Sequence, residues 1–144
     1  MRGLFSPEAM IRLHYTGTRI RLVEDDPINQ EVALALLDDT GLKVDIADNG
    51  RQAVTKDSQT DYALILMDMQ MPELGGIEAT QAIRELPARQ WTPIVAMTAN
   101  AFDEDRERCI AAGMSDFIPK PVDPDVLFQT LARWLSNRSR WGRH

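Results

Sequence analysis

The sequence contains a single cysteine, Cys109, and this scarcity limits the chemistry open to the chain. One thiol cannot close a disulfide within the chain, and it cannot build a metal site made of several cysteines. Apolar runs are also short, because none reaches the roughly 18 residues that a membrane-spanning helix needs. Pro7 interrupts the N-terminal stretch before the apolar segment of a signal peptide could form. These absences favour a cytoplasmic protein without membrane contact.

Basic residues are outnumbered in this chain. It has 16 Lys and Arg against 22 Asp and Glu, which gives a formal net charge of -6. Nucleic-acid phosphates are contacted mainly by Lys and Arg, so direct binding to nucleic acid is not expected. The 144 residues, 44% of them hydrophobic and 26% charged, have the length and composition of one globular domain.

The two ends of the chain are rich in arginine and are expected to lie outside the domain. Residues 1–18 are predicted to form a solvated N-terminal tail or linker remnant, in which Ser6 could cap a short helix with Pro7 at its first position. Residues 137–144 are predicted to form a basic C-terminal tail. The domain itself is therefore assigned to residues 19–136.

Strand and helix patterns alternate through the predicted domain. Short apolar runs bounded by turn residues predict strands, and apolar spacings of three and four predict helices. Strict alternation predicts a five-stranded parallel sheet covered by helices on both faces, which is an α/β three-layer sandwich. Trp91 and Trp134 are expected to pack in the core or at its edge. The expected strands are 20–23, 42–47, 62–67, 93–97 and 116–118, and the expected helices are 27–40, 50–57, 77–86, 102–112 and 123–136.

Polar residues follow four of these strands, at the edge where such sheets carry their functional sites. Glu24 and Asp25 follow the first strand, Asp68 the third, Thr98 the fourth and Lys120 the fifth. Three carboxylates in proximity raise one another's pKa or require a cation, and Mg²⁺ is a cation that such oxygen ligands bind. An ammonium and a hydroxyl beside them suit a phosphoryl group held on a carboxylate.

Four motifs at these positions resemble those of response-regulator receiver domains. They are Leu22-Val23-Glu24-Asp25-Asp26-Pro27, Ile65-Leu66-Met67-Asp68-Met69-Gln70-Met71-Pro72, Ala96-Met97-Thr98-Ala99-Asn100 and Pro119-Lys120-Pro121. The resemblance runs from about Arg19 to Leu135 and is closest to the receivers of hybrid sensor histidine kinases. It implies a flavodoxin-like fold with strand order 2-1-3-4-5 and a role in two-component or phosphorelay signal transduction.

The resemblance also implies the chemistry of the site. Asp68 would be the phosphorylated residue, so the protein would be a phosphoprotein. The side chains of Asp25 and Asp68 would bind Mg²⁺, Glu24 would bind it directly or through a water, and Gln70 would contribute its backbone carbonyl.

The remaining matched positions concern the response to phosphorylation. Thr98 would contact the phosphoryl group and Lys120 would pair with it. Phe117 stands at the family's aromatic switch position, where a phenylalanine must rely on packing because it has no hydroxyl. The side chains of Gln70 and Asn100 stand where the family tunes hydrolysis of the acyl phosphate.

The resemblance implies two kinds of partner. A histidine kinase or a histidine phosphotransfer domain would donate the phosphoryl group and dock around Ile28, Asn29 and the Pro121 loop. A downstream protein would bind the face formed by helix 102–112, strand 116–118 and helix 123–136. The domain would catalyse only its own phosphorylation and slow dephosphorylation, and a hybrid histidine kinase is one candidate for the parent protein.

Two departures from the family pattern and three rival functions remain. Gly75 stands where many relatives have Asp, and Asp26 adds a third consecutive acid that is expected to be solvated. A phosphatase of the haloacid dehalogenase type would need an acid two residues after the nucleophile, where this chain has Gln70. A nucleotide-binding module would need a glycine-rich turn after the first strand. A receiver-like module that binds partners without phosphorylation stays open as an alternative.

Overall fold

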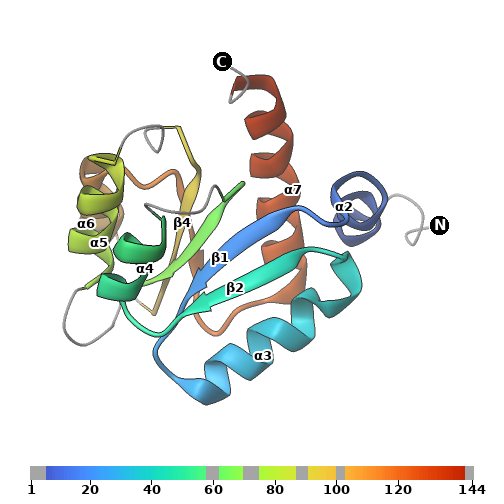
Figure 1. Ribbon diagram of the computed structural model, residues 1–144, viewed down its shortest axis with the longest axis horizontal. Helices are drawn as coiled ribbons and strands as arrows, with labels where there is room; N and C mark the ends of the chain where they lie inside the picture. The colour runs from blue at the N-terminus through green and yellow to red at the C-terminus, as the bar shows by residue number, and fades with distance from the viewer. Residues whose placement is uncertain (1–5, 58–61, 70–74, 87–90, 100–102, 142–144) are drawn as a thin grey trace.

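The computed structural model describes residues 6–57, 62–69, 75–86, 91–99 and 103–141. Within these residues, five parallel strands form one sheet in the order β2-β1-β3-β4-β5 (Figure 1). This confirms the predicted flavodoxin-like topology. The strands are β1 (Arg19–Val23), β2 (Lys43–Ala47), β3 (Ile65–Asp68), β4 (Ile94–Thr98) and β5 (Asp116–Pro119).

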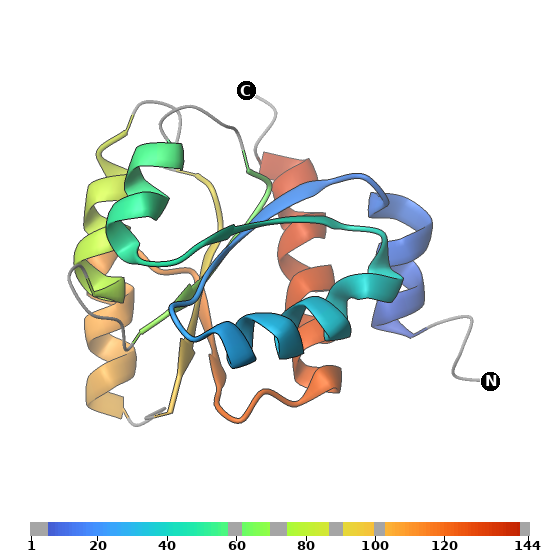
Figure 2. The same cartoon turned by 60° about the horizontal axis from the view of Figure 1, so that its bottom comes forward.

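Helices cover both faces of the sheet (Figure 2). One face packs on α2, α3 and α7 through a cluster that includes Leu22, Leu66 and Leu131. The other face packs on α4, α5 and α6 through a cluster that includes Met67, Ile83 and Cys109. The elements are α2 (Pro7–Tyr15), α3 (Pro27–Leu37), the 3-10 turn η1 (Asp38–Thr40), α4 (Gly50–Asp57), α5 (Gly76–Arg84), α6 (Asp103–Ala112) and α7 (Pro124–Trp141).

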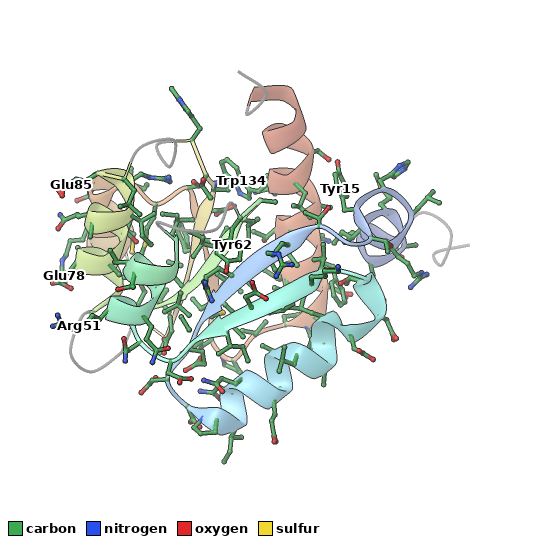
Figure 3. All side chains as sticks on the ribbon, viewed as in Figure 1. Tyr15, Arg51, Tyr62, Glu78, Glu85 and Trp134 are labelled. Carbon is green, nitrogen blue, oxygen red and sulfur yellow. The ribbon has the colours of Figure 1, made fainter. Side chains whose placement is uncertain are left out.

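Residues 7–15 differ from the predicted tail. They form helix α2, whose N-terminus is capped as expected by the Ser6 hydroxyl, which accepts a hydrogen bond from the Ala9 N–H at 3.2 Å. Ile11 is fully buried in the core cluster beneath α3 and α7. The Tyr15 and Ser136 hydroxyls share a 3.3 Å hydrogen bond between α2 and α7. Tyr15 lies where these two helices come close to each other (Figure 3). The prediction of a solvated tail is therefore wrong for these residues, while the domain boundary at residue 19 stays a prediction.

Two further differences from the prediction concern the end of α7 and the position of Trp91. Helix α7 continues to Trp141, beyond the predicted end at residue 136. Trp134 donates a hydrogen bond from its indole N–H to Asp116 of β5 at 2.9 Å, as expected for an edge residue. Trp91 is 76% exposed, so its predicted packing is wrong. It lies in the turn that precedes β4, one residue outside the buried stretch 92–98.

A charged network on the α4 side of β1 includes a buried arginine. The Arg21 side chain is 1% exposed, and its guanidinium lies 4.4 Å from the centre of the Tyr62 ring. The Tyr62 hydroxyl accepts a hydrogen bond from Arg21 and donates one to Asp45 at 2.9 Å. Asp45 in turn pairs with Arg19 at 2.9 Å. Two neighbouring strands and the residue that leads into β3 are thus joined by polar contacts.

In the described part of the chain, we find no helix with both the length and the apolar character needed to cross a membrane.

Candidate functional site

The parallel sheet brings the predicted site residues to one edge. Glu24 follows β1 directly, Asp68 and Thr98 are the last residues of β3 and β4, and Lys120 follows β5. The β4–β5 register pairs Thr98 with Pro119, and the Lys120 N–H donates to the Thr98 carbonyl at 2.8 Å. The backbone therefore fixes where these side chains begin.

Three carboxylates meet at this edge, as predicted. Glu24, Asp25 and Asp68 each offer one oxygen atom, and these atoms lie within 4.8 Å of one another. Glu24 and Asp68 are only 3% and 2% exposed. Carboxylates this close repel, so they favour either a bound proton or a cation with oxygen ligands.

Lys120 supplies the positive charge that the sequence predicted for this site. Its Nζ lies 2.7 Å from Asp68 Oδ1 and 3.7 Å from Glu24 Oε1. Because the Asp68 carboxylate is buried, this contact offsets part of the cost of removing its charge from water. The Lys120–Pro121 peptide that follows is cis.

The pKa of Glu24 reflects this crowding. The pKa is raised from the ordinary 4.5 to about 7, mainly by burial and also by the adjacent Asp68 carboxylate. The hydrogen bond that Glu24 Oε2 accepts from the Asp26 N–H, and the Lys120 ammonium, act in the opposite direction. The Glu24 carboxyl therefore holds a proton more readily than an ordinary glutamate in metal-free solution.

Glu24 should give the folded chain a pH-dependent stability. Since its folded pKa of about 7 exceeds the ordinary 4.5, the folded chain keeps a proton that the unfolded chain has lost between these values. In metal-free solution, the free energy of unfolding should be roughly 1–3 kcal/mol lower at about pH 8 than at about pH 5 because of this group. Chemical denaturation at both pH values measures the difference. Glu24→Gln is the control, because an amide does not titrate, and an equal fall in that variant would contradict the assignment.

The two residues that are predicted to act as the switch lie on β4 and β5. Thr98 is 5% exposed at the end of β4. Phe117 lies opposite Ala96 in the β4–β5 pairing and packs, partly buried, against the core cluster under α4, α5 and α6. Gln70 and Asn100 lie outside the described residues, so their predicted roles stay predictions.

Both departures from the family pattern have a local consequence. The Asp26 carboxylate caps α3 by accepting a hydrogen bond from the Ile28 N–H at 2.9 Å, which gives this acid a structural role. Gly75 occupies the N-cap of α5, where it has no side chain to cap the helix. A Cβ on the neighbouring Gly76 would come within 2.9 Å of both the Asp68 carbonyl and the Met69 sulfur. Only a glycine lets α5 begin this close to the end of β3.

Sequence reasoning missed one contact to the site, the side chain of Gln30 in α3. Its Nε2 donates hydrogen bonds to the Glu24 carbonyl at 2.6 Å and to Asp48 Oδ1 at 2.9 Å. The position follows the acidic turn by one helical turn, and this spacing was the available signal. Asp48 is exposed and takes part in this contact.

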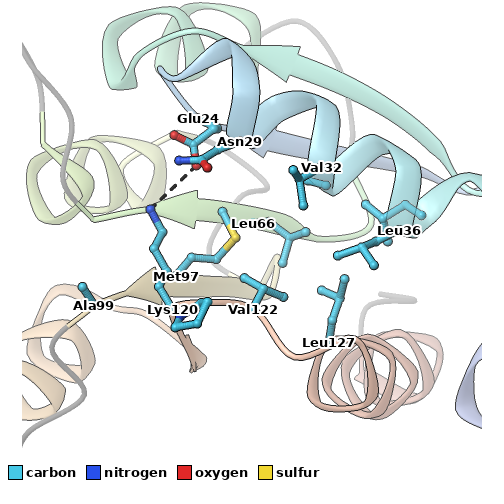
Figure 4. A pocket seen from close by; sticks show the side chains of 13 residues that line it. Glu24, Asn29, Val32, Leu36, Leu66, Met97, Ala99, Lys120, Val122 and Leu127 are labelled. Carbon is cyan, nitrogen blue, oxygen red and sulfur yellow. Dashed lines mark ion pairs between the residues drawn. The ribbon is translucent and has the colours of Figure 1, made fainter.

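An apolar groove of about 480 Å³ opens beside the site, between α3 and the start of α7 (Figure 4). Leu66 and Met97 form its floor on the sheet, while Val32, Leu36 and Leu127 line its sides. Its lining also includes Glu24, Asn29, Lys120 and Pro121. Val32 is 53% exposed at the side of the groove, and Ile28, one turn earlier on α3, is 69% exposed.

Comparison with known sequences supports the predicted resemblance. Residues 20–132 match the family model described as the response regulator receiver domain. The chain is 41% identical over 115 residues to the signal transduction histidine-protein kinase BarA of Escherichia coli (strain K12), covering 80% of this chain and 12% of that kinase. It is 42% identical over 130 residues to hybrid signal transduction histidine kinase B of Dictyostelium discoideum, covering 82% of this chain and 7% of that protein. The chain therefore spans only a small part of these relatives.

Solved structures show the same fold. One is the receiver domain of sensor histidine kinase PA1611 from Pseudomonas aeruginosa PAO1, with a magnesium ion coordinated in its active site cleft. It is 42% identical, with a TM-score of 0.78 over 83% of this chain and 98% of that one. Another is the receiver domain of the response regulator Ssk1 of Saccharomyces cerevisiae, in complex with the histidine phosphotransfer protein Ypd1. It is 28% identical, with a TM-score of 0.79 over 86% of this chain and 92% of that one.

Proposed function

Because the chain belongs to the response regulator receiver domain family, we propose that it accepts a phosphoryl group on Asp68 from a phosphohistidine. The observation that carries the proposal is the buried Asp68 carboxylate, with Lys120 at 2.7 Å and two further acids beside it. The donor is a histidine kinase or a histidine phosphotransfer domain of a two-component or phosphorelay system.

The transfer needs one nucleophilic oxygen and groups that stabilise charge on the phosphoryl oxygens. An Asp68 oxygen forms a bond to phosphorus as the P–N bond of phosphohistidine breaks, and the electron pair of that bond returns to the imidazole. Lys120 then pairs with the phosphoryl group, and the Thr98 hydroxyl donates a hydrogen bond to it. Both groups lie at the carboxyl ends of neighbouring strands, so each can reach the same oxygen-rich position.

The donor atoms at this edge suit Mg²⁺. Three carboxylate oxygens within 4.8 Å of one another are hard ligands of the kind that Mg²⁺ prefers. When bound, the ion neutralises charge on the carboxylates and on the incoming phosphoryl group. We propose Asp25 and Asp68 as side-chain ligands, with Glu24 direct or through a water. The Gln70 carbonyl completes the set by the family resemblance.

The proposed output is a change in the face formed by α6, β5 and α7. Phosphorylation adds close to two negative charges at the end of β3. Thr98 and Lys120 move toward the new group, and Phe117 turns inward from its partly buried position. These movements shift the population of two states of the same fold, and a downstream protein distinguishes them. Slow self-hydrolysis, tuned by the side chains of Gln70 and Asn100, returns the domain to its first state.

The phosphodonor is proposed to dock on α3 and the adjacent groove. Ile28 and Val32 present apolar surface there, and the groove leads past Pro121 to Lys120. The yeast receiver Ssk1 was solved with a phosphotransfer protein, which supports a partner of the same kind for this domain. We also propose a cytoplasmic location, as a domain of a hybrid histidine kinase or as a separate protein.

Labelling from two donors tests this function. Acetyl phosphate with Mg²⁺ should add one phosphoryl group per chain by mass spectrometry, and chelation of Mg²⁺ should prevent it. A phosphohistidine protein that labels the unaltered chain should transfer at least about tenfold more slowly to Ile28→Lys, because a charge replaces an exposed apolar contact. Acetyl phosphate should label this variant normally.

Leu13→Lys provides the matched control, since Leu13 is 76% exposed on α2. Its rate of transfer should equal that of the unaltered chain. Equal transfer to Ile28→Lys would contradict the docking site and leave the phosphoacceptor role intact, whereas no labelling from either donor would contradict the role itself.

A further inference from the structure

Gln30 connects the acidic turn after β1 to the turn after β2. Its Nε2 atom donates to the Glu24 carbonyl at 2.6 Å and to Asp48 Oδ1 at 2.9 Å. A carbonyl and a carboxylate can only accept hydrogen bonds, so the amide nitrogen must face both of them. The Gln30 N–H donates to the Asp26 carbonyl at 2.9 Å, which places this side chain in the first turn of α3, directly over the acidic turn.

The contact fixes the backbone from which two acids of the cluster project. The Glu24 N–H donates to the Ala47 carbonyl at 3.0 Å, and its carbonyl accepts from Gln30. The peptide unit that carries this carbonyl joins Glu24 to Asp25. Holding the carbonyl therefore fixes the plane from which Asp25 starts, as well as the position of Glu24.

Mutual repulsion works against this arrangement. The carboxylates of Glu24, Asp25 and Asp68 offer oxygen atoms within 4.8 Å of one another, and repulsion favours opening of the turn. Groups that hold ligands in place before a metal binds normally raise its affinity. From this geometry we propose that Gln30 is a positioning residue of the divalent-cation site, which holds the Glu24 carbonyl so that the acids of the turn face Asp68. The identity of the ion rests on the function proposed above.

Asp48 holds Gln30 from the other side. The Asp48 N–H donates to Gln52 Oε1 at 3.0 Å, and the Gln52 N–H donates to Asn49 Oδ1 at 2.8 Å. The turn after β2 is thus stiffened where α4 begins. A second glutamine, Gln52, therefore takes part in the same network without touching the acidic turn, and it offers a matched control.

The first experiment compares the same substitution at both glutamines. Methionine keeps the length of the side chain and removes its amide. Titration calorimetry with MgCl₂ alone should show roughly tenfold weaker binding for Gln30→Met, in the range found when partners of metal ligands are removed. Gln52→Met should bind Mg²⁺ like the unaltered chain. Unchanged affinity in Gln30→Met, or an equal loss in both variants, would overturn the proposal.

A second variant separates positioning from general stability and from charge. Gln30→Glu combined with Asp48→Asn lets the amide at position 48 donate to the carboxylate at position 30, so the link between the two turns is kept. The carboxylate cannot donate to the Glu24 carbonyl. It also moves a negative charge toward the site, so electrostatics alone predicts tighter Mg²⁺ binding.

The proposal predicts weaker Mg²⁺ binding in this double variant, with a thermal unfolding midpoint in metal-free buffer close to that of the unaltered chain. This result keeps the proposal testable even if Gln30→Met fails to fold. Tighter binding would overturn the positioning role of Gln30 and leave the proposed function standing. No Mg²⁺ uptake by the unaltered chain would overturn the proposed cation site, and the role of Gln30 with it.

Discussion

Asp68→Asn should abolish phosphoryl uptake from both acetyl phosphate and a phosphohistidine donor. The amide has almost the shape of the carboxylate, but it is not an effective nucleophile and carries no charge for Mg²⁺. Asp68 is 2% exposed, and its Oδ1 lies 2.7 Å from Lys120 Nζ, which also lies 3.7 Å from Glu24 Oε1. Mass spectrometry of the intact chain, after incubation with acetyl phosphate and Mg²⁺, measures the effect.

Asp38→Asn is the matched control for this variant. Asp38 is exposed at the start of the 3-10 turn η1, which precedes β2, whereas the carboxylate cluster lies at the carboxyl ends of the strands. Its amide variant should be labelled like the unaltered chain. Labelling of Asp68→Asn would contradict the site assignment, and a lack of labelling in every variant including the unaltered chain would favour the alternative of a module that binds partners without phosphorylation.

Ile11→Ala should lower the free energy of unfolding by about 3 kcal/mol, within the usual range for removal of a large buried aliphatic side chain. Ile11 has no exposed surface, and it belongs to the same core cluster as Leu37 of α3 and Leu131 of α7. Truncation leaves a cavity where three helices meet the sheet. Chemical denaturation followed by circular dichroism measures the change.

Leu13→Ala tests whether this loss comes from burial. Leu13 lies two residues further along α2 and is 76% exposed. Its truncation should change the free energy of unfolding by less than about 0.5 kcal/mol. Similar small effects in both variants would show that α2 does not contribute to the stability of the domain.

The order of the elements could be predicted because the apolar runs are bounded by residues that typically begin or end helices and strands. Pro27 and Gly41 bounded the first predicted helix, and Gly41 does adopt a left-handed conformation with φ of 79° at its end. Gly113 ends α6 in the same way, with φ of 109°. Because alternating strands and helices must form right-handed crossovers, the strand ends, and with them Glu24, Asp68 and Lys120, could be placed at one edge.

The role of α2 could not be predicted, because it depends on a tertiary contact. A nine-residue helix is marginal in water, so its sequence alone does not distinguish a docked helix from a frayed tail. Ile11 is buried in a core cluster that includes residues of α7, more than a hundred residues away in the chain. Trp91 shows the opposite error, since a large apolar side chain suggested packing although this residue lies in the exposed turn before β4.

The carboxylates could be predicted from strand ends, whereas the support around them could not. Glutamine at position 30 carries no charge and forms no motif by itself. Gln30 donates hydrogen bonds to Glu24 and to Asp48, which belong to separate turns. These two acceptors come close to each other only in the folded chain. Residues that act on the backbone of a ligand, rather than as ligands, are therefore the part of a site that pattern reasoning misses.

The buried Arg21 network restricts how this domain can diverge. Removal of a side chain that contacts the buried Arg21 guanidinium should destabilise the fold, because it leaves a desolvated charge without that contact. Arg21 donates to the Tyr62 hydroxyl, this hydroxyl donates to Asp45, and Asp45 pairs with Arg19. Single replacements of Tyr62 should therefore be tolerated poorly as long as Arg21 is retained, whereas the more exposed Arg19–Asp45 pair should tolerate change better.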